Sequence, residues 1–253
     1  MPARTPASAE RLPLTHPDYV YGPAKNPYSA KLKDFSGLAF SDNATETHAG
    51  SWREKFPAPC RVAEGARSSA RAELHVEIGC NTGHVTRAWA AANPDKLYIG
   101  IDWKFKIIHR GAEKTVAKGL RNLLFFRANV ERLRYMFGPG EVDALYLYFP
   151  DPWPKKAQWK NRFLKESTLR EAARVVRPGG LFHIKTDHDG YYAWMQEAFA
   201  KVDDVWELER ETLDLHAGNP EAAKLDIPDV TLFEKLFIRD GIRIKSAWLR
   251  RRG

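Results

Sequence analysis

Cysteine is nearly absent from this sequence, which has only Cys60 and Cys80 in 253 residues. The two form neither a C-x-x-C pair nor a disulfide framework, so we expect a reducing compartment, the cytoplasm, and no zinc site or other metal centre. Also missing is an apolar run of about 18 residues, the length that a membrane-spanning helix requires. The N-terminus contains no apolar segment of the kind found in secretory signals. These absences predict a cytoplasmic protein that is not inserted in a membrane.

Acidic residues are outnumbered, since 32 Asp and Glu stand against 40 Lys and Arg, for a formal net charge of +8. This balance favours a polyanionic partner such as nucleic acid. A basic surface that contacts only solvent would give the same net charge. Hydrophobic residues make up 43% of the chain, which is typical of a globular protein with a core.

Sustained hydrophobic periodicity is lacking in residues 1–50, which are rich in Pro, Ala, Ser and charged residues. We predict a flexible basic N-terminal extension there, followed by one folded domain over residues 51–253. From about residue 73, strand-like and helix-like segments alternate. The expected strands are 73–79, 96–102, 122–129, 143–149, 181–187, 206–215 and 242–251, and the expected helices are 84–93, 106–120, 130–138, 163–176 and 190–202. This alternation predicts an α/β fold with a mainly parallel, seven-stranded sheet.

Glycines and polar residues stand at the carboxyl ends of the expected strands, where ligands bind in such sheets. The turn EIGCNTG contains Gly79 and Gly83, but it is not the G-x-G-x-x-G turn that receives a pyrophosphate. A cofactor without phosphates fits better, and S-adenosyl-L-methionine is one. Glu77 can then hold its cationic end, Asp102 its ribose and Asn129 its adenine. Any one of these residues alone could equally cap the helix that follows.

The stretch YFPDPWPKK, residues 148–156, contains three prolines that exclude helical and ladder hydrogen bonding. It therefore predicts a stiff loop that holds Asp151 at the end of the fourth strand. Trp153 either stacks on a base or packs beneath the loop. The cations that follow suit phosphates, although the start of a solvated helix would look the same; they are Lys155, Lys156, Lys160 and Arg162.

Five motifs, EIGCNTG, YIGID, FPDPWPKK, IKTDHDG and TLFEKLF, follow one another in this order. In this respect the chain resembles the bacterial-type tRNA (guanine-N7-)-methyltransferases over about residues 73–250. The resemblance implies a Rossmann-like class I methyltransferase fold with helices on both faces of the sheet. It also implies S-adenosyl-L-methionine as methyl donor and N7 of guanine 46, in the variable loop of tRNA, as the target.

The resemblance assigns roles to individual positions. Its methyl-donor contacts correspond to Glu77, Gly79, Gly83, Asp102, Asn129 and Asp151, and Asp151 is also the position treated as catalytic. Its substrate contacts correspond to Lys155, Lys160, Arg162, Asp187, Thr231, Leu232, Phe233 and Glu234. For Asp187, capping of the following helix is the alternative.

This sequence departs from the family pattern at three places. Asn129 replaces the usual Asp, and an amide still pairs with adenine. The segment AQWKNR after the lysines is poorer in Arg and His than usual, although Trp159 could stack on a base. The N-terminal segment is longer than the resemblance explains.

Guanine N7 carries a lone pair and no proton, so its methylation needs no general base. We expect catalysis by positioning and by a carboxylate close to the developing positive charge. Asp151 could stabilise that charge, accept hydrogen bonds from the guanine edge, or do both. Two alternatives remain at this point: a class I methyltransferase for another nucleic-acid or protein amino group, and a non-catalytic RNA-binding relative.

Overall fold

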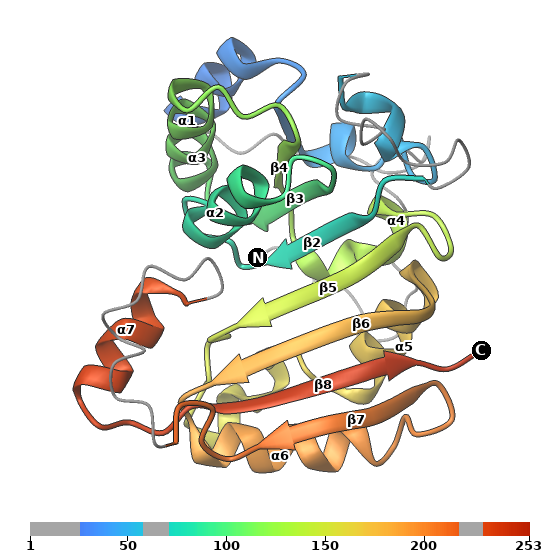
Figure 1. Cartoon of the computed structure of the whole chain (residues 1–253), viewed down its shortest axis with the longest axis vertical. Coiled ribbons are helices and arrows are strands. Elements are labelled where there is room, and N and C mark those ends of the chain that lie inside the picture. The colour runs from blue at the N-terminus through green and yellow to red at the C-terminus, as the bar shows by residue number, and fades with distance from the viewer. Residues whose placement is uncertain (1–25, 58–70, 218–229) are drawn as a thin grey trace, which may run out of the picture.

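A computed structural model of the chain describes residues 26–57, 71–217 and 230–253. In these residues one sheet has the strand order β1-β4-β3-β2-β5-β6-β8-β7 (Figure 1). The strands are β1 (Ala39–Ser41), β2 (Leu74–Ile78), β3 (Leu97–Asp102), β4 (Leu123–Arg127), β5 (Val142–Tyr148), β6 (Val176–Thr186), β7 (Trp206–Thr212) and β8 (Lys245–Arg251). All neighbouring strands are parallel except at β8, which pairs antiparallel with β6 and β7.

Helices cover both faces of the sheet. The helices of the described residues are α1 (Pro27–Lys31), α2 (His84–Ala92), α3 (Phe105–Ala117), α4 (Leu133–Met136), α5 (Glu166–Val175), α6 (Asp189–Phe199) and α7 (Leu232–Arg239), of which α7 stands beside the carboxyl ends of the strands (Figure 1). Successive side chains of a strand point to opposite faces, so the buried rings of Phe125 and Phe126 in β4 enter two different hydrophobic clusters. Phe125 packs with residues of α2 and α3, and Phe126 with the cluster that includes α5 and α6. The predicted α/β class with a mainly parallel sheet is confirmed.

The sheet has eight strands in the described residues, one more than predicted, because β1 comes from the N-terminal segment. Its residues 39–41 pair in parallel with residues 125–127 of β4. The 3₁₀ turns η1 (Leu32–Phe35), η2 (Asp42–Thr45) and η3 (Trp52–Lys55) surround it. Thus residues 26–50 are packed against the domain, whereas residues 1–25 lie outside the described residues. The segment is not basic either, since residues 1–50 contain five Lys and Arg and five Asp and Glu.

The N-terminal segment is anchored by buried polar contacts. Glu141 accepts hydrogen bonds from the backbone amides of Gly50 at 2.7 Å and Trp52 at 2.8 Å. The Trp52 indole is fully buried and donates to the carbonyl of Met136 at 2.6 Å. A carboxylate that accepts backbone N–H groups fixes the chain path, because leaving those buried donors unpaired is costly. The domain boundary at residue 50 stays a prediction.

Other elements follow the predicted pattern with shifted ends. The expected helix at 130–138 is the 3₁₀ turn η5 (Val130–Arg132) followed by α4. Strand β6 begins at Val176, so that the RPGG stretch lies inside it, and α7 was not predicted. No helix of the described residues is long and apolar enough to cross a membrane.

Candidate active site

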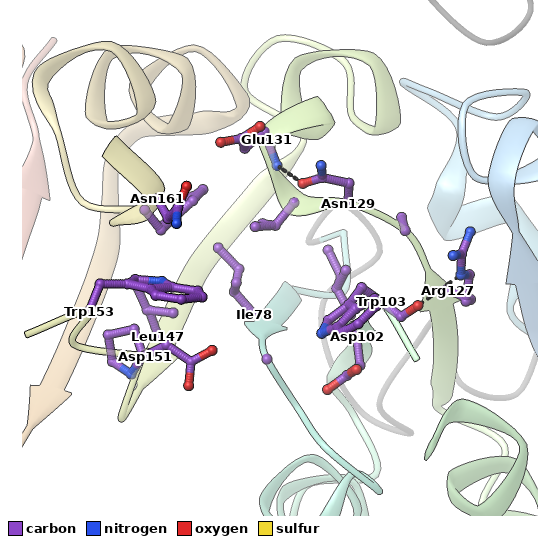
Figure 2. Close-up of a pocket in the computed structure, with 16 residues that line it drawn as sticks. Ile78, Asp102, Trp103, Arg127, Asn129, Glu131, Leu147, Asp151, Trp153 and Asn161 are labelled. Atoms are coloured by element: carbon purple, nitrogen blue, oxygen red, sulfur yellow. Dashed lines mark hydrogen bonds between the residues drawn. The ribbon is translucent and has the colours of Figure 1, made fainter. Parts of the chain in front are cut away.

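A cavity of about 560 Å³ lies where β2, β3, β4 and β5 reach their carboxyl ends (Figure 2). Parallel strands bring these ends to one edge of the sheet, so residues distant in sequence meet there. Four of the predicted site residues line the cavity: Gly79, Asp102, Asn129 and Asp151. Trp153 lines it too, which leaves its side chain available to a ligand.

The glycine turn between β2 and α2 has two different functions. Gly79 lines the cavity at φ 72°, with open space where a side chain would stand. Gly83 precedes α2 at φ 66°, and a Cβ there would lie 2.7 Å from the Phe125 ring. Since Gly83 is not among the lining residues, its direct effect is on packing. It lets α2 approach the sheet closely.

Glu77, in β2, is buried and is not among the residues that line the cavity. Its carboxylate is buried and accepts a hydrogen bond from the Thr86 hydroxyl at the start of α2. Burial raises the pKa of Glu77 to about 7, and the bond to Thr86 opposes part of that shift. The predicted contact with the cationic end of the methyl donor stays a prediction.

Asp102 and Asn129 end neighbouring strands on one side of the cavity (Figure 2). An Asp102 carboxylate oxygen accepts from the Lys104 amide at 3.0 Å, and burial raises the pKa of Asp102. The Asn129 side-chain oxygen accepts from the Glu131 amide at 3.0 Å and so caps η5. The amide nitrogen of Asn129 is then the group suited to a ligand's acceptor.

Trp103 is a cavity residue that the sequence reasoning missed. Its side chain is 64% exposed although it lines the cavity, and the Lys104 ammonium lies 5.4 Å from the ring centroid. Its carbonyl accepts from Arg127 Nε at 2.8 Å, and Arg127 is itself paired with Asp42. An aromatic residue directly after an acid at a strand end was the available signal.

The loop at residues 148–156, which the sequence predicted to be stiff, contains two unusual backbone angles. Phe149 and Trp153 adopt φ values of 53° and 44°, which are unusual for residues other than glycine. Asp151 lies between them, exposed and in the cavity wall (Figure 2). Such strain persists only where surrounding contacts impose it.

The four cations after the loop fall into two groups. Lys155, Lys156 and Lys160 are exposed on or beside the turn η6 (Lys156–Asn161), as phosphate contacts require. Arg162 is only 2% exposed, and its Nε donates to the carbonyl of Pro152 at 2.9 Å. A guanidinium buried in this way does not fit the predicted substrate contact.

The remaining predicted substrate residues lie outside the cavity wall. Thr231 and Glu234 cap α7 reciprocally, and Glu234 is fully buried against Lys185, with Nζ 3.1 Å from both carboxylate oxygens. Leu232 and Phe233 are exposed on the first turn of α7. Asp187 does not cap α6; His188 does, through its Nδ1 at 3.0 Å from the Tyr191 amide.

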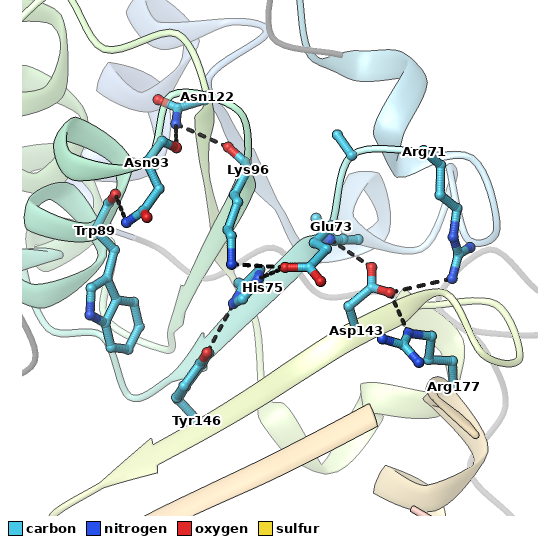
Figure 3. A network of polar contacts seen from close by, with 12 residues as sticks. Arg71, Glu73, His75, Trp89, Asn93, Lys96, Asn122, Asp143, Tyr146 and Arg177 are labelled. Carbon is cyan, nitrogen blue, oxygen red and sulfur yellow. Dashed lines mark hydrogen bonds and ion pairs between the residues drawn. The ribbon is translucent and has the colours of Figure 1, made fainter. Parts of the chain in front are cut away.

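The opposite edge of the sheet carries charged contacts of a structural kind (Figure 3). Asp143, at the start of β5, accepts from the Leu74 amide at 2.8 Å and from Arg177 at 2.6 Å. His75 in β2 lies 2.9 Å from the Tyr146 hydroxyl and 3.2 Å from a Glu73 oxygen. Asp143, Leu74 and Arg177 lie at or next to strand starts, and none of the groups named here lines the cavity.

Comparison with known proteins identifies the family of this chain. Residues 71–246 match the family model Methyltransf_4, whose description is "Putative methyltransferase". A tRNA (guanine-N(7)-)-methyltransferase of Enterococcus faecalis is 33% identical over 77% of this chain and 82% of its own length. That of Bacillus cytotoxicus is 31% identical over 86% of this chain and 91% of its own. The chain belongs to the tRNA (guanine-N7-)-methyltransferase family.

Solved structures outside this family share its fold. The 16S rRNA methyltransferase KamB superposes with a TM-score of 0.53 at 20% identity, over 72% of this chain and 88% of its own. A 16S rRNA (adenine(1408)-N(1))-methyltransferase of Catenulisporales acidiphilia gives a TM-score of 0.51 at 16% identity, over 71% of this chain and 84% of its own. These similarities support the class I methyltransferase fold.

Proposed function

We propose that this protein transfers a methyl group from S-adenosyl-L-methionine to N7 of guanine 46 in the variable loop of tRNA, in the cytoplasm. Membership of the tRNA (guanine-N7-)-methyltransferase family supports the reaction. The observation that carries the proposal is the cavity, in which a strand-end acid, a strand-end amide and an exposed indole face the proline loop with Asp151.

The cavity suits a methyl donor without phosphates. Asp102 would accept the ribose hydroxyls, and Trp103 and Asn129 would hold the adenine by stacking and by a hydrogen bond. Glu77 would supply negative charge beneath the cationic end. When bound, S-adenosyl-L-methionine supplies the methyl group. At Gly79 the turn presents its backbone to the cavity. The turn lacks the G-x-G-x-x-G motif that binds a pyrophosphate.

Asp151 would act on the guanine. The N7 lone pair takes the methyl group, and the ring gains the positive charge that the sulfonium loses, so no proton moves to a base. A carboxylate held at this point stabilises the charge as it forms. It can also accept from the N–H groups of the guanine edge, which adenine lacks at the same positions. The exposed Lys155 and Lys160, which follow this loop, would contact phosphates of the tRNA.

The test incubates the protein with unmodified tRNA and labelled donor, then maps methylated nucleosides by mass. We expect 7-methylguanosine at position 46 and none in a tRNA whose guanine 46 is replaced by adenine. Asp151→Asn should lower kcat at least about tenfold and leave tRNA affinity nearly intact, because phosphate contacts dominate affinity. Label in another nucleoside or in protein would assign the site to a different methyl acceptor, and binding without turnover to a non-catalytic RNA-binding protein.

A further inference from the structure

We propose that Arg162 is a positioning residue of the methyl-transfer reaction, which holds residues 150–154, here called the proline loop, and thereby Asp151. The inference rests on the proposed function. It replaces the phosphate contact that the sequence suggested for this arginine.

Arg162 is enclosed by aromatic side chains. Its guanidinium carbon lies 4.7 Å from the ring centroid of Trp159, 4.9 Å from Tyr191 and 5.2 Å from Trp194. Its side chain is buried, and Nε donates to the carbonyl of Pro152 at 2.9 Å. Desolvated cation–π contacts are stronger than exposed ones, and the planar guanidinium suits them better than an ammonium does.

Two of these three aromatic side chains, Trp194 and Tyr191, are themselves held by hydrogen bonds. Trp194 Nε1 donates to the carbonyl of Leu164 at 2.7 Å, and the Leu164 amide donates to the Tyr191 hydroxyl at 3.2 Å. Both aromatic residues belong to α6, whose inner face is buried in the core. Arg162 therefore links the proline loop to a rigid helix.

Hydrogen bonding holds the proline loop at one point. Pro150, Pro152 and Pro154 have no N–H group. Among the residues that the structure describes, the Arg162–Pro152 bond is the only hydrogen bond to any of residues 150–154. That carbonyl directly follows Asp151 and directly precedes Trp153, whose φ of 44° must be imposed from outside.

A displaced loop would displace Asp151 from the guanine. Misplacement of a reacting group by about 1 Å can cost roughly 100-fold in rate. A phosphate contact would behave differently, because its loss lowers the slope of log affinity against log salt by about one. The two roles are thus separable in one set of measurements.

The experiment uses the full-length protein and one unmodified tRNA. Arg162→Met and Arg162→Lys are assayed for single-turnover rate at saturating tRNA, and for tRNA affinity from low to high salt. We expect rates about 10–100-fold below wild type for both variants, with tRNA affinity and its salt slope unchanged. Lys160→Ala is the comparison that should flatten the slope. Arg170→Met, which removes an exposed arginine paired with Asp204 away from the cavity, should alter neither quantity.

Thermal denaturation accompanies each variant. If Arg162→Met is unfolded, the test rests on Arg162→Lys, because lysine keeps the positive charge and lacks only the planar guanidinium group. A wild-type rate in a folded Arg162 variant, or a slope flattened as in Lys160→Ala, overturns the proposal. Absence of 7-methylguanosine in the wild-type reaction would instead overturn the proposed function, so the two failures are distinguishable.

Discussion

Among single residues, Glu77 has a charge state that should respond to the methyl donor. Burial raises its pKa from 4.5 to about 7, so a large fraction of the group is protonated near neutral pH. A cation bound beside it favours the carboxylate and lowers the pKa again. Donor binding below pH 7 must then release a proton.

We therefore expect donor affinity to rise between pH 5 and about 7, as the Glu77 proton becomes easier to remove, and then to level off. Glu77→Gln should bind the donor more weakly, by about 1–3 kcal/mol at pH 7.5, and without this pH dependence. Calorimetry in buffers of different ionisation enthalpy measures both affinity and proton release. A wild-type affinity that is flat over this window would place Glu77 away from the donor's cation.

The same pKa gives an independent control in the absence of donor. Because the folded-state pKa is raised, the contribution of Glu77 to the free energy of unfolding is fully present below its ordinary pKa of 4.5 and is lost as pH rises through about 7. Glu77→Gln has no such carboxyl group, so urea denaturation across this range should show a smaller loss for the variant than for wild type.

Residues at strand ends were predictable because topology alone brings them together. Gly79, Asp102, Asn129 and Asp151 lie at the carboxyl ends of β2, β3, β4 and β5, which are parallel neighbours in the sheet. Arg162 was not predictable in this way. Lys160 and Arg162 are both cations in one short segment, and the sequence does not distinguish them. Arg162 is buried because α6, which begins 27 residues later, packs against it.

Among the elements, α7 depends on a buried ion pair. Glu234 is fully buried, caps the helix through the Thr231 amide at 3.2 Å, and pairs with Lys185 of β6. His216 Nε2 also lies 2.7 Å from it. The motifs IKTD and TLFE, which are far apart in the sequence, therefore meet in the fold. Both motifs were visible in the sequence but α7 was not predicted, because TLFE was interpreted only as a substrate contact.

Removing one partner of a buried pair leaves a charge uncompensated. We expect Glu234→Gln to lower the free energy of unfolding by about 3–5 kcal/mol, and Thr231→Ala, which removes only a cap, by about 1 kcal/mol. The double variant Lys185→Met with Glu234→Leu should recover much of the loss, since no buried charge remains. Urea denaturation of the four proteins tests this ranking. Equal effects of Glu234→Gln and Thr231→Ala would show that the pair contributes little.

At the scale of the whole molecule, the N-terminal segment completes the sheet. Its Glu46 is buried and pairs with Arg132 at 2.6 Å, and Asp42 pairs with Arg127 at the cavity rim. The ring centroids of Phe40 and Trp52 lie 5.0 Å apart. Composition alone suggested an extension here, because a three-residue edge strand with turns leaves no periodicity to detect.

Two truncated proteins test where the folded unit begins. The protein that starts at residue 26 keeps every contact just described, and we expect its melting temperature to stay close to that of the full chain. The protein that starts at residue 51 loses β1 and both acidic partners, Asp42 and Glu46. Breaking the buried Glu46 pair alone should cost about 3–5 kcal/mol, and the loss of Asp42 should loosen Arg127 and the Trp103 carbonyl that it holds. We therefore expect a strongly lowered melting temperature and weaker donor binding for residues 51–253. If the protein of residues 51–253 has the same melting temperature as the full chain and binds the donor equally well, the domain begins at residue 51 and β1 is an accessory strand.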